Sequence, residues 1–301
     1  MSIRVDGHGP PLAGGFRRIG LVGRRRNEHL ETVLERVSRF AQEHEIELVP
    51  EPTLAIGSLE GLPPLEDPPE IDLLLTLGGD GTLLRGVRRV VGHDIPVLGV
   101  NLGRLGFLTS VSPTDLENAL ESALAGEAHL DRRFTLEGRI VHRDGSHGPS
   151  LWALNDLVLH KGGVARVVRL DLEVGRESDR EEVGSFSGDG VIVATPTGST
   201  AYSLSAGGPI IAPTMDCIVV TPISPHTMAM RPLVLPDHVL LSIRAIDRCE
   251  ELVVTADGQM GYPLTPGDRV EVEKGSDRVP LVRFRGQTFF DTLRRALNWA
   301  V

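Results

Sequence analysis

The chain has 301 residues, 41% of them hydrophobic and 24% charged, which is typical of folded globular domains and leaves room for two of them. The formal net charge of −10 argues against nucleic acid and membrane surfaces as partners, so an anionic ligand needs a local site. Cys217 and Cys249 are too few and too far apart for a disulfide framework or a zinc motif, which fits a reducing cytoplasm.

The start of the chain is rich in glycine and proline, and we expect residues 1–16 to form a flexible tail. Residues 1–15 lack the apolar core of a signal peptide, and no apolar run reaches the length of a membrane span. We therefore expect a cytoplasmic protein.

Strand-like and helix-like patterns alternate over the first part of the chain. The expected strands are residues 18–22, 46–49, 72–77 and 96–100. The expected helices are residues 29–43, 83–91 and 114–124. This alternation predicts an α/β domain with a parallel sheet, which we place at residues 17–128.

Short β-like runs separated by Gly, Pro and Asp replace this alternation in the second part. They include residues 151–159, 167–174, 190–194, 239–246, 252–256 and 269–273. The pattern predicts a β-rich, mostly antiparallel domain at residues 129–287. A last helical pattern covers residues 289–299, and we expect this C-terminal helix, within residues 288–301, to pack back on the first domain.

The run Gly78-Gly79-Asp80-Gly81-Thr82 lies between an expected buried strand and an expected helix. Ligands of open α/β sheets bind at such strand ends, where glycines let backbone N–H groups approach phosphate oxygens. A carboxylate there repels phosphate, so Asp80 is better explained as a base that accepts a hydroxyl proton, or as a magnesium partner. The alternative is a tight turn in which Asp80 caps the helix.

Two further polar motifs interrupt apolar strands. Residues 101–108 begin with Asn101 and contain two glycines that permit close backbone approach, although a simple turn also has this composition. Asn155 and Asp156 break an apolar pattern in which polar groups are costly unless satisfied, so we expect them to face a base edge and ribose hydroxyls. The alternative for this pair is a bulge at a sheet edge.

Residues 187–209 are dense in hydroxyl groups. A buried strand leads to a turn of Ser and Thr, a helix start at Ser199 or Thr200, and a second glycine turn. Small donors can surround a nucleotide while Tyr202 offers a stacking face, and we favour this interpretation over hydroxyls that only cap turns.

Three common motifs are absent from the sequence. No Walker-type phosphate loop occurs, and no dinucleotide-binding glycine fingerprint follows the first strand. Ser205 lacks a nucleophile elbow because Ser203 stands where that turn needs glycine. His226 has no second His or Cys at metal-ligand spacing, so it is a loop histidine or lines a cleft.

On these motifs the chain resembles the NAD kinases, ATP-dependent enzymes that phosphorylate the 2′-hydroxyl of the adenosine ribose of NAD. The resemblance runs from about Ile19 to the C-terminal helix. Lipid kinases of the diacylglycerol and sphingosine type carry a similar glycine loop, and phosphofructokinases a related one. Residues 101–108, Asn155-Asp156 and residues 195–209 make the resemblance specific, because they occur together in this order.

The resemblance implies an α/β N-terminal domain, a β-rich C-terminal domain and NAD bound in the cleft between them. It assigns the proton acceptor to Asp80, with Gly81 beside it, and the adenosine part of NAD to Asn155 and Asp156. The other dinucleotide-contacting positions that it implies are Arg166, Asp189, Thr200, Ala201, Tyr202, Ser203, Leu204, Ser205 and Gln259. The phosphate loop comprises Gly78, Gly79, Gly81 and Thr82.

Phosphoryl transfer from ATP needs Mg²⁺ to neutralise charge and an acceptor for the hydroxyl proton. We expect Mg²⁺ to arrive with ATP, because no cluster of carboxylates suits a protein cage. Arg24, Arg25 and Arg26 are candidates for ATP contact or form a solvated charge run. The resemblance also implies a homodimer or homotetramer. A lipid or sphingoid kinase and a nucleotide sensor without turnover are the rival interpretations.

Overall fold

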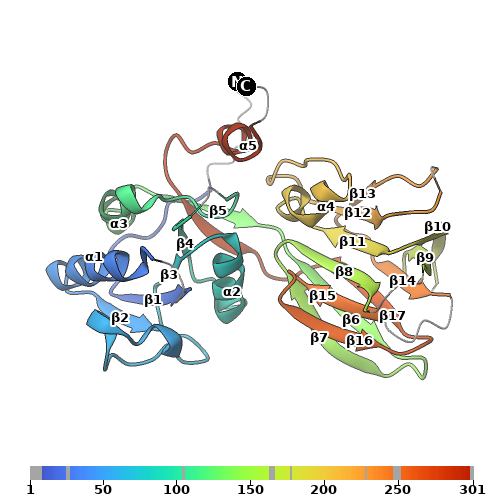
Figure 1. Ribbon diagram of the computed structural model, residues 1–301, viewed down its shortest axis with the longest axis horizontal. Helices are drawn as coiled ribbons and strands as arrows, with labels where there is room; N and C mark the ends of the chain where they lie inside the picture. The colour runs from blue at the N-terminus through green and yellow to red at the C-terminus, as the bar shows by residue number, and fades with distance from the viewer. Residues whose placement is uncertain are drawn as a thin grey trace. The chain divides into compact units, whose positions relative to one another are not determined.

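The computed structural model describes residues 9–24, 28–103, 106–162, 167–176, 178–227, 229–246 and 252–298. The chain divides into two compact units (Figure 1). The first unit is Met1–Arg133 together with Asp277–Val301, and the second is Phe134–Ser276. Among the described residues, no helix is both long and apolar enough to cross a membrane.

The first unit is built on a six-stranded sheet in the order β2-β1-β3-β4-β18-β5. Its strands are β1 (Arg18–Gly23), β2 (Glu47–Pro50), β3 (Leu73–Leu77), β4 (Val97–Val100), β5 (His129–Arg133) and β18 (Val279–Arg283). Neighbouring strands are parallel except β18 and β5, which are antiparallel. Every residue of β3 is buried, as a parallel sheet covered on both faces requires.

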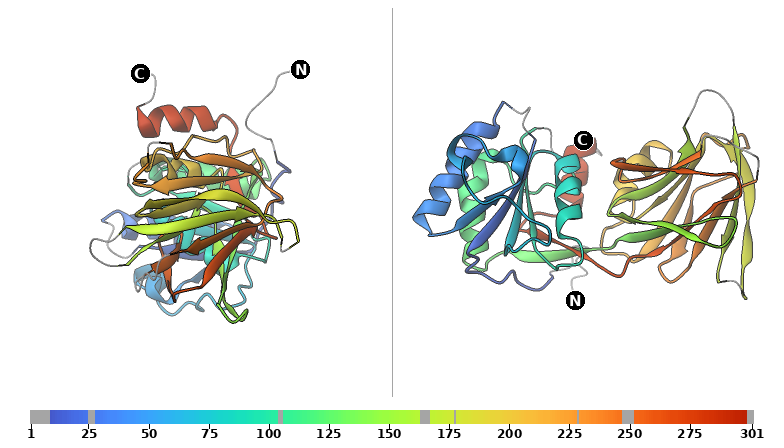
Figure 2. Two further views of the ribbon diagram at one scale, coloured as in Figure 1. Left: turned by 90° about the vertical axis from the view of Figure 1, so that its right-hand side faces the viewer. Right: turned by 90° about the horizontal axis from the view of Figure 1, so that it is seen from below.

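Helices cover both faces of this sheet (Figure 2). The helices on the two faces are α1 (Leu30–Glu43), α2 (Asp80–Val90) and α3 (Leu116–Leu124). The first unit also contains α5 (Phe289–Leu297) and the short 3₁₀ turns η1 (Pro52–Leu54), η2 (Gly57–Leu59) and η3 (Pro113–Asp115). α1 and α3 share one core with Ile19, Leu21 and Leu75. α2 lies on the other face, so close to β3 that a Cβ at Gly86 would stand 2.7 Å from the Thr76 side chain.

α2 differs from the helix that we expect at residues 83–91, because it begins at Asp80. Gly79 is the N-cap with extended backbone, and Asp80 occupies the first turn. A carboxylate in this position interacts favourably with the positive end of the helix dipole. The residue that looked like part of a loop therefore sits on a rigid element.

The boundaries of the units differ from those expected at residues 128/129 and 287/288. β5 and β18 both belong to the sheet of the first unit. Leu281 of β18 pairs with Val97 of β4 on one side and with Asp131 of β5 on the other. The chain thus returns to the first unit at residue 277, since a short strand does not show in its own sequence which sheet it will join.

The second unit consists of two six-stranded sheets in the orders β10-β9-β14-β17-β6-β7 and β13-β12-β11-β8-β15-β16. The strands are β6 (Leu136–Val141), β7 (His147–Ala153), β8 (Asp156–Lys161), β9 (Val168–Val174), β10 (Glu181–Gly188), β11 (Gly190–Ala194), β12 (Cys217–Ile223), β13 (Leu233–Pro236), β14 (Leu241–Ala245), β15 (Leu252–Ala256), β16 (Met260–Leu264) and β17 (Arg269–Lys274). Inner-face residues of both sheets form one apolar core, as in a sandwich. The turn η4 (Gly198–Thr200) and the short helix α4 (Tyr202–Ser205) follow β11.

The expected strand at residues 151–159 is wrong as a single strand. It divides into β7 and β8, which belong to different sheets, and Leu154 and Asn155 form the crossover. The bulge considered for Asn155 and Asp156 is wrong too, because β8 is an interior strand between β11 and β15. Apart from such boundaries, the predicted fold class is confirmed: a mostly parallel α/β unit, an antiparallel β-rich unit and a C-terminal helix.

Candidate active site

The carboxylate of Asp80 is held by the loop that follows β4. Its Oδ2 atom accepts a hydrogen bond from the N–H of Phe107 at 2.8 Å. Its Oδ1 atom accepts from the N–H groups of Leu108 and Thr109, both at 3.1 Å, and from the Thr109 hydroxyl at 3.3 Å. The motifs at residues 78–82 and 101–108 therefore lie together, and the expected alternative of a helix cap by the Asp80 side chain is wrong, because Gly79 is the N-cap and, among the described residues, no side chain caps α2.

Gly106 and Asn101 explain the sequence of this loop. A Cβ on Gly106 would lie 2.1 Å from Oδ1 of Asp80, so only glycine lets the backbone pass over the carboxylate. The buried side chain of Asn101 accepts from the N–H of Gly103 at 2.9 Å, which is an Asx turn. Asn101 thus shapes the loop.

The glycines of residues 78–82 divide into two kinds. A Cβ on Gly78 would lie 2.3 Å from the hydroxyl oxygen of the buried Thr82, so Gly78 and Thr82 pack against each other. A Cβ on Gly79 or Gly81 would meet nothing within 4 Å. The space beside Gly79 and Gly81 is therefore open to a ligand at the N-terminus of α2, where anions bind well.

Of the three arginines after β1, only Arg24 lies among the described residues. It is exposed, and its backbone N–H donates to the carbonyl of Leu77 at 3.4 Å. Arg25 and Arg26 lie outside the described residues.

The second unit contains a cavity of about 650 Å³. Its lining includes five of the residues that we expected to contact a dinucleotide: Asn155, Asp156, Asp189, Ala201 and Tyr202. It also includes residues that our sequence reasoning missed: Val158, His160, Lys161, Ile223, Thr255, Asp257 and Gly258. Residues that are far apart in the sequence therefore line one cavity, because one sheet and the turn after β11 bring them together.

Asp257 holds the crossover between β7 and β8 in place. Its carboxylate accepts from the N–H groups of Asn155 at 2.8 Å, Leu154 at 3.2 Å and Asp156 at 3.3 Å. The N–H of Asp257 donates in return to the carbonyl of Asp156 at 2.9 Å. Asp257 has a φ of 51°, a left-handed conformation that Asp tolerates better than most residues. The only local signal for this clamp is an Asp-Gly pair after a β-like run.

The Asp156 carboxyl group is buried, with 5% of the residue exposed, although it lines the cavity. Burial, and then the neighbouring charge of Asp257, raise its pKa to about 7. Within the described part of the chain, no group donates a hydrogen bond to this carboxylate. A ligand with hydroxyl groups would satisfy it, and buried carboxyl groups with a raised pKa are frequent at functional sites.

Asp189 lies in a different environment on the same cavity. Its Oδ1 atom is 3.0 Å from Nζ of Lys161, and hydrogen bonds from Lys161 and Ser224 lower its pKa. His226 is an exposed loop residue whose N–H donates to the carbonyl of Ser187 at 2.8 Å. One carboxylate of the cavity is therefore paired, while Asp156 is buried beside a like charge.

Many hydroxyls of residues 195–203 are used inside the protein. The Thr195 hydroxyl donates to the Leu154 carbonyl at 2.6 Å, and the Ser199 hydroxyl to Pro196 at 2.7 Å. Ser203 is fully buried and bonds to the Thr221 hydroxyl at 2.8 Å. For Thr195 and Ser199 the turn-capping alternative describes the structure, and none of these three residues lines the cavity.

The remaining expected contact residues lie around this turn. The Thr200 hydroxyl donates to the Thr197 carbonyl at 3.1 Å, whereas Tyr202 is 46% exposed and lines the cavity. Leu204 is half-buried and Ser205 exposed on α4, and Gln259 is exposed on the turn between β15 and β16. Arg166 lies outside the described residues.

Comparison with known proteins finds matches to both parts of the chain. The ATP-NAD kinase N-terminal domain matches residues 65–128, and the ATP-NAD kinase C-terminal domain matches residues 154–284. An NAD kinase of Gemmatimonas aurantiaca is 48% identical over 282 residues, which is 94% of this chain and 96% of that protein. The chain belongs to the NAD kinase family.

Other NAD kinases extend the similarity in sequence and structure. One from Heliobacterium modesticaldum is 48% identical over 76% of this chain and 79% of its own length. The crystal structure of yeast NADH kinase complexed with NADH has a TM-score of 0.86 at 25% identity, covering 97% of this chain and 93% of that one. An NAD kinase from Archaeoglobus fulgidus in complex with ATP has a TM-score of 0.73 at 28% identity, covering 93% and 98%.

Proposed function

We propose that this NAD kinase family member transfers the γ-phosphoryl group of ATP to the 2′-hydroxyl of the adenosine ribose of NAD, which gives NADP and ADP. The observation that carries the proposal is the Asp80 carboxylate, fixed at the N-terminus of α2 beside backbone that is open at Gly79 and Gly81. This arrangement supports the proposal, because phosphoryl transfer to a hydroxyl requires a proton acceptor beside a site suited to phosphate oxygens.

Asp80 acts as the proton acceptor in this proposal. Three of its four hydrogen bonds fall on Oδ1 and one on Oδ2, so Oδ2 keeps the greater accepting capacity. As the ribose oxygen forms its bond to the γ-phosphorus and the bond to the ADP oxygen breaks, the hydroxyl proton passes to Oδ2. The loop at residues 106–109 holds the acceptor still during transfer.

The phosphoryl donor in this proposal is ATP complexed with Mg²⁺, and the metal ion would neutralise phosphate charge. The donor set around Asp80 does not fit a magnesium ligand, because four N–H and O–H groups already point at the carboxylate. Within the described residues, no group of three or more His, Cys, Asp or Glu side chains could hold a metal ion.

The cavity of the second unit binds the adenosine part of NAD in this proposal. Asn155 offers a donor and an acceptor to the base edge, Asp156 accepts from ribose hydroxyls, and Tyr202 supplies a flat apolar face. The buried carboxyl of Asp156 supports this role, since a ligand hydroxyl would replace the partner that burial denies it.

The deciding experiment incubates the purified chain with ATP, Mg²⁺ and NAD and measures NADP with a coupled dehydrogenase. We expect NADP to form and to require Mg²⁺. Parallel reactions with inorganic polyphosphate in place of ATP, or NADH in place of NAD, define the donor and acceptor. Phosphorylation of sphingosine without NADP formation would favour a lipid kinase. Binding of NAD without turnover would favour a nucleotide sensor.

The homodimer or homotetramer stays a prediction, to be checked by light scattering.

A further inference from the structure

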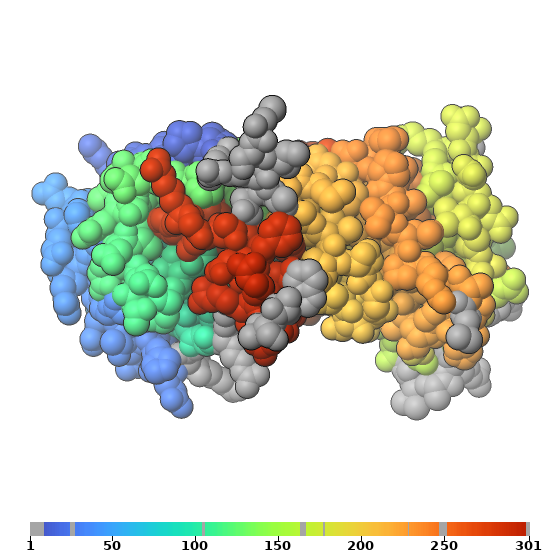
Figure 3. Space-filling view, turned by 90° about the horizontal axis from the view of Figure 1, so that it is seen from above, coloured from blue at the N-terminus to red at the C-terminus, as the bar shows by residue number. Residues whose placement is uncertain are grey.

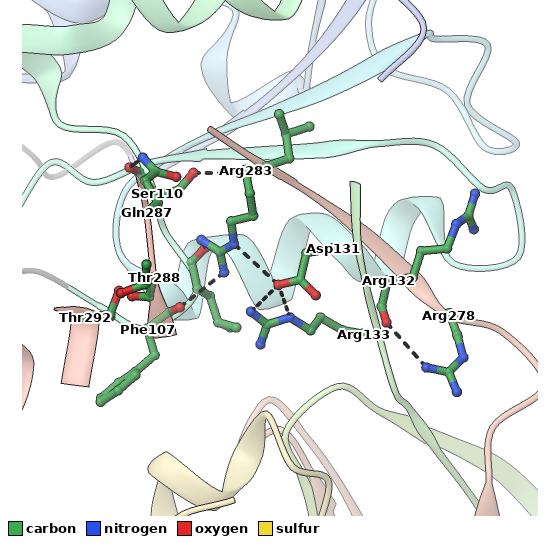
Figure 4. A network of polar contacts seen from close by, with 12 residues as sticks. Phe107, Ser110, Asp131, Arg132, Arg133, Arg278, Arg283, Gln287, Thr288 and Thr292 are labelled. Carbon is green, nitrogen blue, oxygen red and sulfur yellow. Dashed lines mark hydrogen bonds and ion pairs between the residues drawn. The ribbon is translucent and has the colours of Figure 1, made fainter. Parts of the chain in front are cut away.

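Arg283, the last residue of β18, contacts the same loop that holds Asp80 (Figure 4). Its Nη1 atom donates to the carbonyl of Leu108 at 3.1 Å and its Nη2 atom to the carbonyl of Phe107 at 3.3 Å. Arg283 stands 175 residues beyond Leu108 in the sequence, so only the order of strands in the sheet brings them together.

Two consecutive peptide groups connect Arg283 to Asp80. In the first, the Phe107 carbonyl accepts from Arg283 while the Leu108 N–H donates to Asp80. In the second, the Leu108 carbonyl accepts from Arg283 while the Thr109 N–H donates to Asp80. Both peptide dipoles therefore point their negative ends at the guanidinium group and their positive ends at the carboxylate, and each charge strengthens the hydrogen bonds of the other.

The charges around Arg283 support this arrangement. The Asp131 carboxylate accepts from Nε of Arg133 at 2.8 Å and also lies 3.7 Å from Nε of Arg283. Two guanidinium groups thus share one close carboxylate, and Asp80 supplies a second negative charge through the peptides. Burial, and then the charge of Arg133, lower the pKa of Arg283, while the charges of Asp131 and Asp80 raise it. An arginine nevertheless stays protonated in proteins.

The C-terminal segment of the first unit, residues 277–298, also contacts Ser110, the next residue of the loop. Nε2 of Gln287 donates to the Ser110 carbonyl at 2.6 Å, and the Ser110 hydroxyl donates to the Val282 carbonyl at 3.3 Å. Figure 3 shows this segment in red against the green surface of the first unit. The loop at residues 106–110 is therefore held between α2 on one side and the C-terminal segment on the other.

We propose that Arg283 is a positioning residue for phosphoryl transfer, which orients the Asp80 carboxylate through the two peptide groups of residues 107–109. This inference rests on the proposed function. According to this proposal, loss of Arg283 changes the position of the Asp80 carboxylate. It does not change the recognition of NAD by the second unit.

The test uses the full-length chain with Arg283→Met, Arg283→Lys and the control Arg278→Met. Arg278 belongs to the same segment and also donates to a backbone carbonyl, that of Arg132 at 3.4 Å. We expect Arg283→Met to lower kcat by about 10²-fold, because small misplacements are costly in transfer reactions, with KM for NAD changed by less than about 3-fold. Lysine keeps the charge but lacks the fork for two carbonyls, so it restores kcat only in part. The control keeps kcat near that of the wild type.

A double-mutant cycle separates positioning from general stabilisation. In an Asp80→Asn background, Arg283→Met has nothing left to position, so we expect a further change in kcat of less than about 3-fold. An equal loss in both backgrounds overturns the inference, as does an unchanged kcat of Arg283→Met in an active chain. If circular dichroism shows that Arg283→Met does not fold, Arg283→Lys carries the same cycle. A wild-type chain that makes no NADP overturns the proposed function itself.

Discussion

The hydrogen bonds of Asp80 fall unequally on its two carboxylate oxygens. Oδ1 accepts from three donors and Oδ2 from only one. We interpret Oδ1 as the anchored atom and Oδ2 as the atom that takes the proton. This asymmetry makes substitutions at the site informative, because anchoring and proton acceptance can be removed separately.

Asp80→Asn should lower kcat by about 10²–10⁴-fold while most NAD affinity remains, since a positioned proton acceptor contributes about this much. An asparagine oxygen can replace Oδ1, but its NH₂ group then faces the N–H of Phe107, so the loop also has to shift. The matched control is Thr109→Val, which removes only the hydroxyl 3.3 Å from Oδ1 and should cost less than about 10-fold. Steady-state kinetics and calorimetry with NAD measure both. Turnover near the wild-type rate in Asp80→Asn would refute the mechanism.

Asp156 should make the stability of the protein depend on pH. Its folded-state pKa of about 7 lies above the unfolded value of about 3.9, so the native state binds more protons between these values. The free energy of unfolding therefore falls as the pH rises through this window. The Asp156→Asn variant lacks this fall. Its free energy of unfolding relative to that of the wild type should therefore rise by on the order of 2–4 kcal/mol from pH 5 to pH 8.

Urea unfolding followed by circular dichroism at pH 5 and pH 8 measures this difference. Asp189→Asn is the control, because the Lys161 hydrogen bond lowers the pKa of Asp189 and keeps it ionised across the whole window. It should show no pH-dependent difference from the wild type. The same result for Asp156→Asn would mean that Asp156 is ionised at pH 5 in the folded protein.

At the scale of elements, two glycines in neighbouring loops have opposite roles. A Cβ at position 106 would overlap the Asp80 carboxylate at 2.1 Å, whereas a Cβ at position 79 would meet open space. Gly106→Ala should therefore destabilise the fold by about 1–3 kcal/mol and lower kcat. Gly79→Ala should leave stability nearly unchanged and raise KM for ATP, because its methyl group occupies space that a phosphate needs.

Thermal denaturation and initial rates at varied ATP concentration distinguish these two variants. Equal destabilisation by both would show that residues 78–82 form only a tight turn. An unchanged KM for ATP in Gly79→Ala would remove the nucleotide from this end of α2.

The motifs that could be found in the sequence are those whose signal is local. An apolar run that ends in glycines marked Asp80, and a polar pair inside an apolar pattern marked Asn155 and Asp156. The contacts of Asp257 and Arg283 cannot be predicted from the sequence, because each residue hydrogen-bonds to a loop 102 or 175 residues away. The sequence around each of them is that of an ordinary strand end. The sequence of residues 195–203 is ambiguous for a different reason. Hydroxyl groups that stabilise a turn and hydroxyl groups that bind a ligand come from the same residue types.

At the scale of the whole molecule, the two units differ in how the chain builds them. The second unit is one continuous segment, Phe134–Ser276, with its own core and with every residue that lines the cavity. The first unit is discontinuous, and β18 lies inside its sheet between β4 and β5.

A fragment of residues 134–276 should therefore fold alone and bind NAD, although more weakly than the full chain. A fragment of residues 1–276 should lose the first unit, because removal of β18 leaves β5 without its neighbour. Circular dichroism and calorimetry with NAD check both fragments. An unfolded 134–276 fragment, or a cooperative first unit in the 1–276 fragment, would contradict this division.

The late position of β18 also sets an order of events during synthesis. Domains generally fold as units while the chain emerges from the ribosome, so the segment Phe134–Ser276 can fold before the last residues have been made. The sheet of the first unit cannot be complete before Val279–Arg283 has been synthesised, and until then the loop around Asp80 lacks its hydrogen bonds from Arg283. In the proposed mechanism, a chain that stops before β18 would thus keep a folded second unit but would lack the strand whose last residue supports the loop around Asp80.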